Sequence, residues 1–322
     1  MSLNYIGSKT SLLPFLDSHI KVAKGQVFGD LFAGTGSVGH YFCQKYQAKI
    51  IANDICYYSY ILNMAKLIPF SQQEFDYHHQ EMSKCSSIGF ISNNYTPLAD
   101  RLYFSLDNGK RIDGSLEYLR ATDISPECKN ALKASILYGA DHIANVASVY
   151  GAFLKKLKKT AQKEISFPRL ETSTFSDNQV YNLDVFDLKN IQFDIVYIDT
   201  PYNQRGYCSN YHILETIAID DNPEIRLKTG LRFDTGIKNS CFTRKTQVRE
   251  AFIKLIEKLS KCTKYIFLSY SSEGIVPIAE LWDLFIKYGS VQVHSTEYKR
   301  FKSNAKTKDN KVIEYLFEIE IK

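Results

Sequence analysis

The amino-acid sequence predicts an α/β fold with a doubly wound parallel sheet, a terminal antiparallel β hairpin and an inserted, mainly helical domain. Three observations lead to this prediction. Short apolar strand patterns alternate with helical patterns in the first 69 residues, which is typical of a parallel sheet. The alternation stops between residues 70 and 174 and then resumes. Near the end of the chain, two β-rich stretches flank a basic stretch, which is typical of a hairpin.

The first strands and helices are predicted around a glycine turn. Residues 26–32 form a short apolar run, which breaks at the turn and continues as an amphipathic stretch to Tyr46. A second strand pattern covers residues 49–52. The helical pattern over residues 57–68 ends at Pro69, because proline does not continue a helix.

The middle of the chain differs in composition. Residues 70–174 are polar and rich in Tyr, Ser and Asn, and they carry one long helical pattern, 126–159, without alternating strands. We therefore expect an inserted domain over residues 70–174, and a second domain formed by residues 1–69 and 175–322. The remaining predicted elements are strands at 180–183, 193–198 and 265–270, a helix at 247–261, and hairpin strands at 291–298 and 312–321.

Composition excludes several classes of protein. Of the 322 residues, 44% are hydrophobic, so a wholly disordered chain is excluded. The net charge of +5 permits a polyanionic partner without requiring one. No apolar run approaches the roughly 18 residues of a membrane span, and the start of the chain lacks the apolar stretch of a secretory signal, so we expect a cytoplasmic protein. Seven scattered cysteines without a C-x-x-C pair argue against a disulfide framework and a thiolate zinc site.

The glycine turn is a candidate ligand site. Residues 34–39 read G-x-G-x-x-G, and Asp54 follows Gly34 by twenty residues. Glycines let the backbone approach a ligand, a helix N-terminus favours an anion, and an acidic group after the second strand accepts hydrogen bonds from ribose hydroxyls. The pattern predicts a nucleoside-bearing cofactor whose anion is a pyrophosphate or a methionine carboxylate. The alternative is a structural turn in which glycine only relieves backbone strain.

A second candidate site follows the predicted strand at 193–198. It consists of Asp199, Thr200, Pro201 and Tyr202, at the carboxyl end of a strand, where ligands bind in open α/β sheets. The carboxylate can accept a hydrogen bond from an exocyclic amine, the proline holds the preceding residue extended, and the tyrosine offers a flat face for a base. The alternative is an ordinary strand-to-loop turn.

Four motifs occur in a fixed order: Y-I-G-S-K at residues 5–9, F-A-G-T-G at 32–36, N-D at 53–54 and D-T-P-Y at 199–202. In that order they resemble the motifs of Dam-like (alpha-group) DNA adenine N6-methyltransferases. Residues 145–156 and 203–218 further resemble modification methylases of that group that accompany type IIS restriction enzymes. One departure is Thr200, where the family usually has proline.

The resemblance implies a Rossmann-like methyltransferase fold that transfers a methyl group from S-adenosylmethionine to N6 of adenine in duplex DNA by base flipping. Residues 1–69 and 175–322 would then form the catalytic domain, and residues 70–174 would recognise the target. The implied cofactor-binding residues are Tyr5, Lys9, Phe32, Gly34, Gly36, Asp54, Asp184, Val185 and Asp199. The implied catalytic residues are Asp199, Pro201 and Tyr202.

The resemblance also assigns individual roles. Tyr5 and Lys9 would border the methionine end of the cofactor, and Asp54 would bind the ribose hydroxyls. Asp184 and Val185 would meet the adenine ring of the cofactor. The Asp199 carboxylate and a backbone carbonyl of Thr200 or Pro201 would accept hydrogen bonds from the target amine, and Tyr202 would stack on the flipped base.

Basic residues are candidate contacts to double-stranded DNA, because lysine and arginine neutralise phosphates. They are Lys155, Lys156, Arg205, Lys299, Arg300 and Lys302. A solvated helix end and a charged hairpin tip are the alternative interpretations. No metal is expected, because the histidines form no H-E-x-x-H pattern. We expect a monomer, and a cognate restriction endonuclease or a second methylase is a compatible partner.

Two other reactions fit part of the sequence. An N4-cytosine methyltransferase uses related chemistry, but Asp199 together with the motif at residues 5–9 favours adenine. A nicotinamide-dependent oxidoreductase would explain the glycine turn and Asp54, but it assigns no role to Asp199 and Tyr202. A DNA-binding module without catalysis is a third alternative, and the same two residues argue against it.

Overall fold

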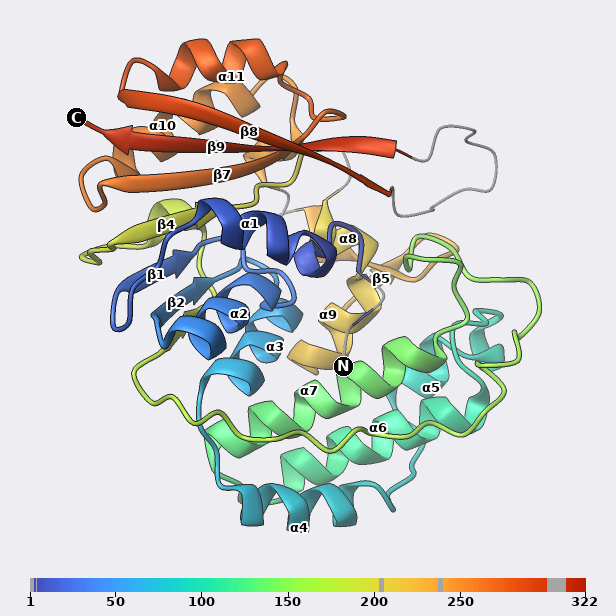
Figure 1. Ribbon diagram of the computed structural model, residues 1–322. Coiled ribbons are helices and arrows are strands. Elements are labelled where there is room, and N and C mark those ends of the chain that lie inside the picture. The colour runs from blue at the N-terminus through green and yellow to red at the C-terminus, as the bar shows by residue number, and fades with distance from the viewer. Residues whose placement is uncertain (1–2, 4, 203–205, 237–239, 300–310) are drawn as a thin grey trace. The chain divides into compact units, whose positions relative to one another are not determined.

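The structure is a computed structural model that describes residues 3, 5–202, 206–236, 240–299 and 311–322 (Figure 1). Contacts divide the chain into two compact units. Unit 1 comprises Met1–Ile6, Cys56–Ser176 and Cys208–Lys238, and unit 2 comprises Gly7–Ile55, Asp177–Tyr207 and Asn239–Lys322. The insertion expected at residues 70–174 falls inside unit 1, which also takes in residues 56–69 and 208–238.

Unit 2 contains a seven-stranded sheet among the described residues, with the order β3-β2-β1-β4-β7-β9-β8 (Figure 1). The pairs from β3 through β7 are parallel, and β9 pairs antiparallel with both β7 and β8. The strands are β1 (Val27–Asp30), β2 (Lys49–Asn53), β3 (Gln179–Tyr181), β4 (Ile195–Ile198), β7 (Tyr265–Ser271), β8 (Gly289–Lys299) and β9 (Lys311–Ile321). The helices are η1 (Lys9–Leu12), α1 (Leu13–His19), α2 (Ser37–Tyr46), η3 (Val185–Asp187), η5 (Cys241–Thr243), α10 (Val248–Leu259) and α11 (Ile278–Phe285).

Helices cover both faces of this sheet. Gly39 of α2 lies against Ile50 of β2, because a Cβ added at Gly39 would lie 2.9 Å from the Ile50 Cγ2. The next residue, Ile51, belongs instead to the buried cluster that side chains of α10 and α11 complete. Successive strand residues point to opposite faces, so α2 and the α10–α11 pair lie on opposite faces. The predicted doubly wound α/β fold is confirmed.

The terminal hairpin is also confirmed. β8 and β9 pair in one continuous register from Gly289 opposite Ile321 to Lys299 opposite Lys311. β9 then pairs with β7, so the hairpin extends the parallel sheet at one edge. Side chains of Leu316 and Ile319 are fully buried, and burial of their apolar surface stabilises this edge of the sheet.

Unit 1 is mainly helical. Its helix α7 contacts α3, α4, α6 and α9 and forms the centre of the unit. The described elements are α3 (Tyr57–Leu67), α4 (Gln72–Met82), α5 (Phe90–Asn94), η2 (Pro97–Ala99), α6 (Leu106–Ala121), α7 (Pro126–Ile143), α9 (His212–Ile219), a two-stranded ribbon of β5 (Ile225–Arg226) and β6 (Leu231–Arg232), and η4 (Phe233–Gly236), with α8 (Tyr207–Asn210) at the change of units.

The helix predicted to run from residue 126 to about residue 159 is wrong beyond Ile143. There, the side chain of the fully buried Asn145 forms hydrogen bonds with backbone groups. Its Nδ2 donates to the carbonyls of Leu102 and Leu154 at 2.8 and 3.0 Å, and its Oδ1 accepts from the Lys158 amide at 2.9 Å. Side-chain bonds of this kind compete with helical hydrogen bonds, so the chain continues as a loop.

Candidate active site

The glycine turn and Asp199 lie at neighbouring strand ends. β1 runs into the glycine turn, β4 runs into Asp199, and the two strands pair in parallel with Phe28 opposite Ile195. The chain leaves β1 toward β2 and β3 on one side, and later adds β4 and β7 on the other. This reversal is a topological switch point, where open α/β sheets bind their ligands at the carboxyl ends of the strands.

The glycine turn has a backbone that only glycine adopts readily. Gly34 and Gly36 have φ values of 51° and 73°, in the left-handed region. Gly39, the third glycine, serves packing instead: its amide donates to the buried Asp30 Oδ2 at 2.9 Å, and its lack of a side chain lets α2 approach β2. The turn therefore needs its glycines for both conformation and close helix packing.

Asp54 joins three segments at the same edge of the sheet. Its Oδ2 accepts a hydrogen bond from the Gly34 amide at 2.8 Å, and its backbone carbonyl accepts one from the Asn182 Nδ2 at 2.8 Å. The carboxylate is partly exposed. Gly34 and Asp54, twenty residues apart in the sequence, are thus in direct contact.

The other residues expected near a cofactor lie in different surroundings. Phe32 is partly buried and meets the Phe242 ring edge-on, with the centroids 5.5 Å apart. The Asp184 side chain is exposed and caps η3 by accepting a hydrogen bond from the Phe186 amide at 3.0 Å. The Val185 side chain is buried in the core cluster.

Lys9, Asp199 and Glu314 form a buried charged cluster. The Lys9 Nζ lies 2.9 Å from the Asp199 Oδ1 and 2.9 Å from the Glu314 Oε1. Lys9 is 4% exposed, Asp199 18% and Glu314 0%. The Ser269 hydroxyl also donates to Glu314 Oε1 at 2.8 Å, whereas Glu314 Oε2 has no hydrogen-bond partner among the described residues. One ammonium is therefore shared by two carboxylates.

The cluster shifts the pKa values of its members. Burial opposes the charged form of Lys9, but Asp199 and Glu314 outweigh it and hold the Lys9 pKa well above its usual value. Burial raises the pKa of Asp199 to about 6, Lys9 acts against this, and the Glu314 charge adds to it. At neutral pH, Lys9 is charged and Asp199 is a stronger base than an ordinary carboxylate.

Tyr202 lies beside this cluster. The Lys9 Nζ is 5.8 Å from the centroid of its ring, which packs edge-on against Tyr270 at 6.4 Å. Burial raises its pKa, so the phenol stays neutral. Pro201 is partly buried, and Thr200 is 1% exposed, with a hydroxyl that has no hydrogen-bond partner in the described part of the chain. Lys9, Asp199 and Tyr202 are thus brought together.

Tyr5 belongs to unit 1, whereas Lys9 belongs to unit 2. The Tyr5 ring stacks on Tyr211 with centroids 4.8 Å apart, and the Tyr58 hydroxyl lies 3.3 Å from the Tyr5 hydroxyl. Tyr5 is 8% exposed. The start of the Y-I-G-S-K motif is therefore held by an aromatic cluster of the helical unit.

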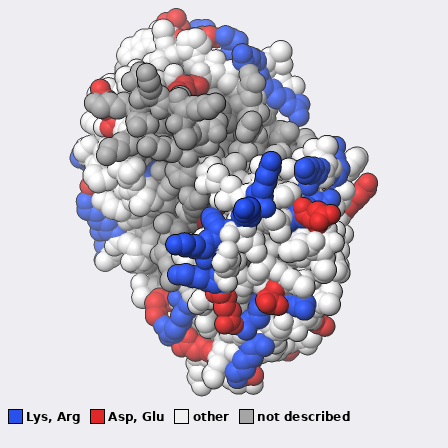
Figure 2. Space-filling view, turned by 90° about the vertical axis from the view of Figure 1, so that its right-hand side faces the viewer, with Lys and Arg blue, Asp and Glu red and all other residues white. Residues whose placement is uncertain are grey.

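Of the basic residues expected to contact DNA, Lys155 and Lys156 are exposed in the loop that follows α7. Lys299 is the last residue of β8. Arg205, Arg300 and Lys302 lie outside the described residues. Figure 2 shows one face of the molecule, on which Lys and Arg side chains stand beside Asp and Glu side chains.

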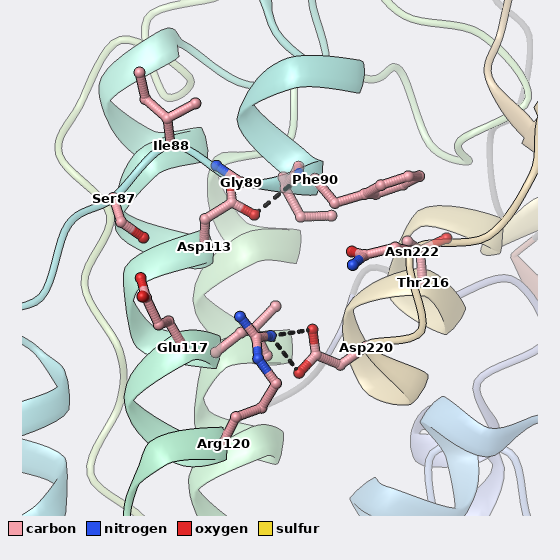
Figure 3. A pocket seen from close by; sticks show the side chains of 12 residues that line it. Ser87, Ile88, Gly89, Phe90, Asp113, Glu117, Arg120, Thr216, Asp220 and Asn222 are labelled. Carbon is pink, nitrogen blue, oxygen red and sulfur yellow. Dashed lines mark hydrogen bonds and ion pairs between the residues drawn. The ribbon is translucent and has the colours of Figure 1, made fainter.

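A separate pocket lies within unit 1 (Figure 3). On one side, the Asp113 carboxylate accepts hydrogen bonds from three backbone amides at the start of α5, including Gly89 at 3.0 Å. On the other side, Arg120 is ion-paired with Asp220 at 2.6 Å. Both acidic side chains are engaged by protein groups, so their placement is explained by the structure of the unit.

Neither a metal site nor a membrane span is found in the part of the chain that the structure describes. No group of three or more His, Cys, Asp or Glu side chains could hold a metal ion there. No helix among the same residues is long and apolar enough to cross a membrane.

Glu314 is the site residue that sequence reasoning missed. It comes from β9, more than one hundred residues after Asp199, and belongs to none of the four motifs. One signal was available. Val312, Glu314 and Leu316 alternate along a strand and all are buried, so a glutamate occupies a position where period-two patterning predicts an apolar side chain.

Comparisons with known proteins identify relatives of the chain. Residues 5–284 match the family described as D12 class N6 adenine-specific DNA methyltransferase. The type II methyltransferase M.NlaIII of Neisseria lactamica is 38% identical over 346 residues, covering 99% of both chains. The type II methyltransferase M.FokI of Planomicrobium okeanokoites is 36% identical over 99% of this chain, which spans 52% of that relative. Among solved structures, the rRNA methyltransferase aviRa of Streptomyces viridochromogenes aligns at a TM-score of 0.38 with 11% identity, over 98% of this chain and 88% of that one.

Proposed function

Since the chain belongs to the D12 class of N6 adenine-specific DNA methyltransferases, we propose that it methylates N6 of adenine in duplex DNA with S-adenosylmethionine as the methyl donor. The observation that carries the proposal is the position of Asp199 next to the glycine turn at the switch point of the sheet. The relatives named as type II methyltransferases support a role as the modification half of a restriction–modification system.

The cofactor is assigned to the edge of the sheet formed by the glycine turn and Asp54. Gly34 and Gly36 leave the backbone open to a ligand. The Asp54 carboxylate accepts a hydrogen bond from the Gly34 amide and can also accept hydrogen bonds from ribose hydroxyls. When bound, S-adenosylmethionine supplies a methyl group activated by a sulfonium. Tyr5, Lys9, Phe32, Asp184, Val185 and Asp199 complete the proposed cofactor-binding set.

The proposed chemistry rests on Asp199 and Tyr202. The adenine N6 lone pair is delocalised into the ring, so N6 is a poor nucleophile. Two acceptors, the Asp199 carboxylate and the carbonyl of Thr200 or Pro201, would draw the amine hydrogens and localise the lone pair toward the methyl group. A base inside a duplex cannot reach these acceptors, so it must flip out, and the Tyr202 ring offers a surface on which it stacks.

DNA binding is proposed for unit 1 and the hairpin. Lys155 and Lys156 are exposed lysines on a loop fixed by Asn145, which suits phosphate contacts. We also propose phosphate contacts for Lys299, Arg300, Lys302 and Arg205. Residues 70–174 would supply target recognition.

The reaction is tested by incubating the protein with S-adenosylmethionine and duplex DNA of mixed sequence, and then mapping modified bases by sequencing. We expect N6-methyladenine at one short recurring sequence. N4-methylcytosine in its place, or no modified base over a range of conditions, would refute the proposed reaction. Omission of the methyl donor is the control.

Asp54→Ala is expected to weaken binding of S-adenosylmethionine about 10- to 100-fold, because hydrogen bonds to a charged acceptor contribute about 1.5 to 3 kcal/mol. Titration calorimetry measures this affinity. The matched control is Asp177→Ala, which removes an aspartate of unit 2 that is 66% exposed. Equal affinities of the Asp54 variant and the unmodified protein would show that the ribose contact is misassigned.

A further inference from the structure

Glu314 is an unusual residue for the interior of a β strand. It is 0% exposed, and its Oε1 contacts both Lys9 and Ser269, whereas its Oε2 has no hydrogen-bond partner among the described residues. A buried carboxylate is costly unless donors satisfy both oxygens. Stability of the strand alone therefore does not explain this side chain.

A second carboxylate is also unnecessary for holding Lys9. The Asp199 carboxylate already pairs with the Lys9 ammonium at 2.9 Å, and that pair is neutral. Glu314 adds a negative charge at the same distance from the same ammonium. This charge weakens the stabilisation of the Asp199 carboxylate by Lys9. An ammonium bound to two carboxylates stabilises each negative charge less than it would stabilise one alone.

We propose that Glu314 is a positioning residue for methyl transfer: by sharing the Lys9 ammonium, it keeps the Asp199 carboxylate a strong acceptor for the N6 amine of the target adenine. The inference rests on the proposed function. Glu314 contacts neither the DNA nor the methyl donor; it acts on Asp199 through the shared Lys9 ammonium and through its own negative charge. The terminal hairpin thereby contributes to the chemistry as well as extending the sheet.

Methyl transfer forms one bond to the methyl carbon and breaks another. The N6 lone pair forms a bond to the methyl carbon, and the carbon–sulfur bond breaks with its electron pair remaining on sulfur. N6 then carries a positive charge and loses one proton, whose bonding electrons return to N6 as a lone pair. The Asp199 carboxylate accepts that proton, and solvent removes it after the product leaves. A carboxylate fully neutralised by Lys9 would be a weaker acceptor at this step.

Charged and titratable groups face Asp199 from several elements of unit 2. They are Lys9 from η1, Glu314 from β9, Tyr197 from β4, Tyr202 from the loop after β4 and Tyr298 from β8. Burial raises the pKa of each tyrosine, so all three are neutral near pH 6. Burial raises the Asp199 pKa most; of the charges that act on it, that of Lys9 lowers the pKa and that of Glu314 raises it.

Glu314→Gln tests the inference, because it removes the charge and retains an oxygen for Lys9 and Ser269. The single-turnover rate of adenine methylation is measured from pH 5 to 9 with saturating cofactor and DNA. Loss of the Glu314 charge lowers the Asp199 pKa, so we expect the acid limb of the profile to move about one unit toward lower pH. The maximal rate should fall on the order of tenfold, because the acceptor becomes weaker. The matched control is Glu320→Gln, on the same strand but 45% exposed and paired with Lys264, whose profile should match that of the unmodified protein.

An unmoved acid limb in a folded Glu314→Gln protein would overturn the inference, because a purely structural role lowers the rate equally at every pH. If that variant does not fold, the unmodified protein still provides a test: burial and the Glu314 charge together raise the Asp199 pKa to about 6, so an acid limb near pH 4 overturns the inference. Absence of methylation by the unmodified protein would instead refute the proposed function. The two failures are therefore distinguishable.

Discussion

Asp199→Asn is expected to lower the single-turnover rate of adenine methylation by about 10²- to 10⁴-fold, the range for loss of a group that transfers a proton or stabilises developing charge. The substitution keeps the shape of the side chain. It removes the negative charge that draws the amine hydrogens, and the amide cannot take up the proton. Affinity for S-adenosylmethionine should fall much less, which calorimetry measures in parallel.

The matched control for this substitution is Asp194→Asn. Asp194 lies at the other end of the same strand, just before β4 begins. Its carboxylate accepts a hydrogen bond from the Val27 amide at 2.7 Å. We expect its rate to stay within a few-fold of that of the unmodified protein. A rate for Asp199→Asn within tenfold of the unmodified protein would exclude Asp199 as the acceptor.

Lys9→Met is expected to destabilise unit 2 by about 3 to 5 kcal/mol at pH 8, because it leaves Asp199 and Glu314 without the ammonium that both contact. The methionine fills a similar volume, so the effect comes from charge. The loss of stability is measured by thermal unfolding, with a signal that reports on unit 2. Lys264→Met is the control: Lys264 is 62% exposed, and its surface pair with Glu320 should contribute no more than about 1 kcal/mol.

The sign of the pH dependence gives a second check on Lys9→Met. Burial and the Glu314 charge raise the Asp199 pKa, and the variant removes the ammonium that opposes them. The folded state then binds more protons than the unfolded state, so its stability falls as pH rises through and above pH 6. The deficit relative to the unmodified protein should be larger at pH 8 than at pH 5.5. An equal deficit at both values would show that the destabilisation is not electrostatic.

The parallel sheet is predictable because its strands are short apolar runs that end at turn residues. The helices of unit 1 are harder to predict from the sequence than these strands. α4 has only two buried side chains, Phe75 and Met82, so its apolar period is weak. The buried face of α6 includes Gly109, Asp113 and Ser115, which form no apolar stripe. Tertiary contacts rather than local pattern make these segments helical.

The site is predictable to the extent that its residues follow strand ends. Asp54 and Asp199 are found by motif, since each directly follows a strand. Glu314 reaches the same cluster through antiparallel pairing of β9 with β7, a contact that no local spacing encodes. The sequence predicts helix for the loop after α7, because the pattern of side chains does not reveal the hydrogen bonds of Asn145 to Leu102 and Leu154.

The assignment of Asp199 and Tyr202 to different steps is tested most directly by comparing ordinary duplex DNA with a duplex in which the target adenine faces a mismatch. The mismatch lowers the cost of flipping the base, which is a few kcal/mol. Single-turnover methylation by Tyr202→Ala should be partly restored on the mismatched duplex, because this variant lacks only the stacking surface. Tyr202→Phe should retain much of the activity on both substrates. Asp199→Asn should be restored on neither, whereas equal restoration of the Tyr202→Ala and Asp199→Asn variants would contradict the assignment of this segment as the catalytic site.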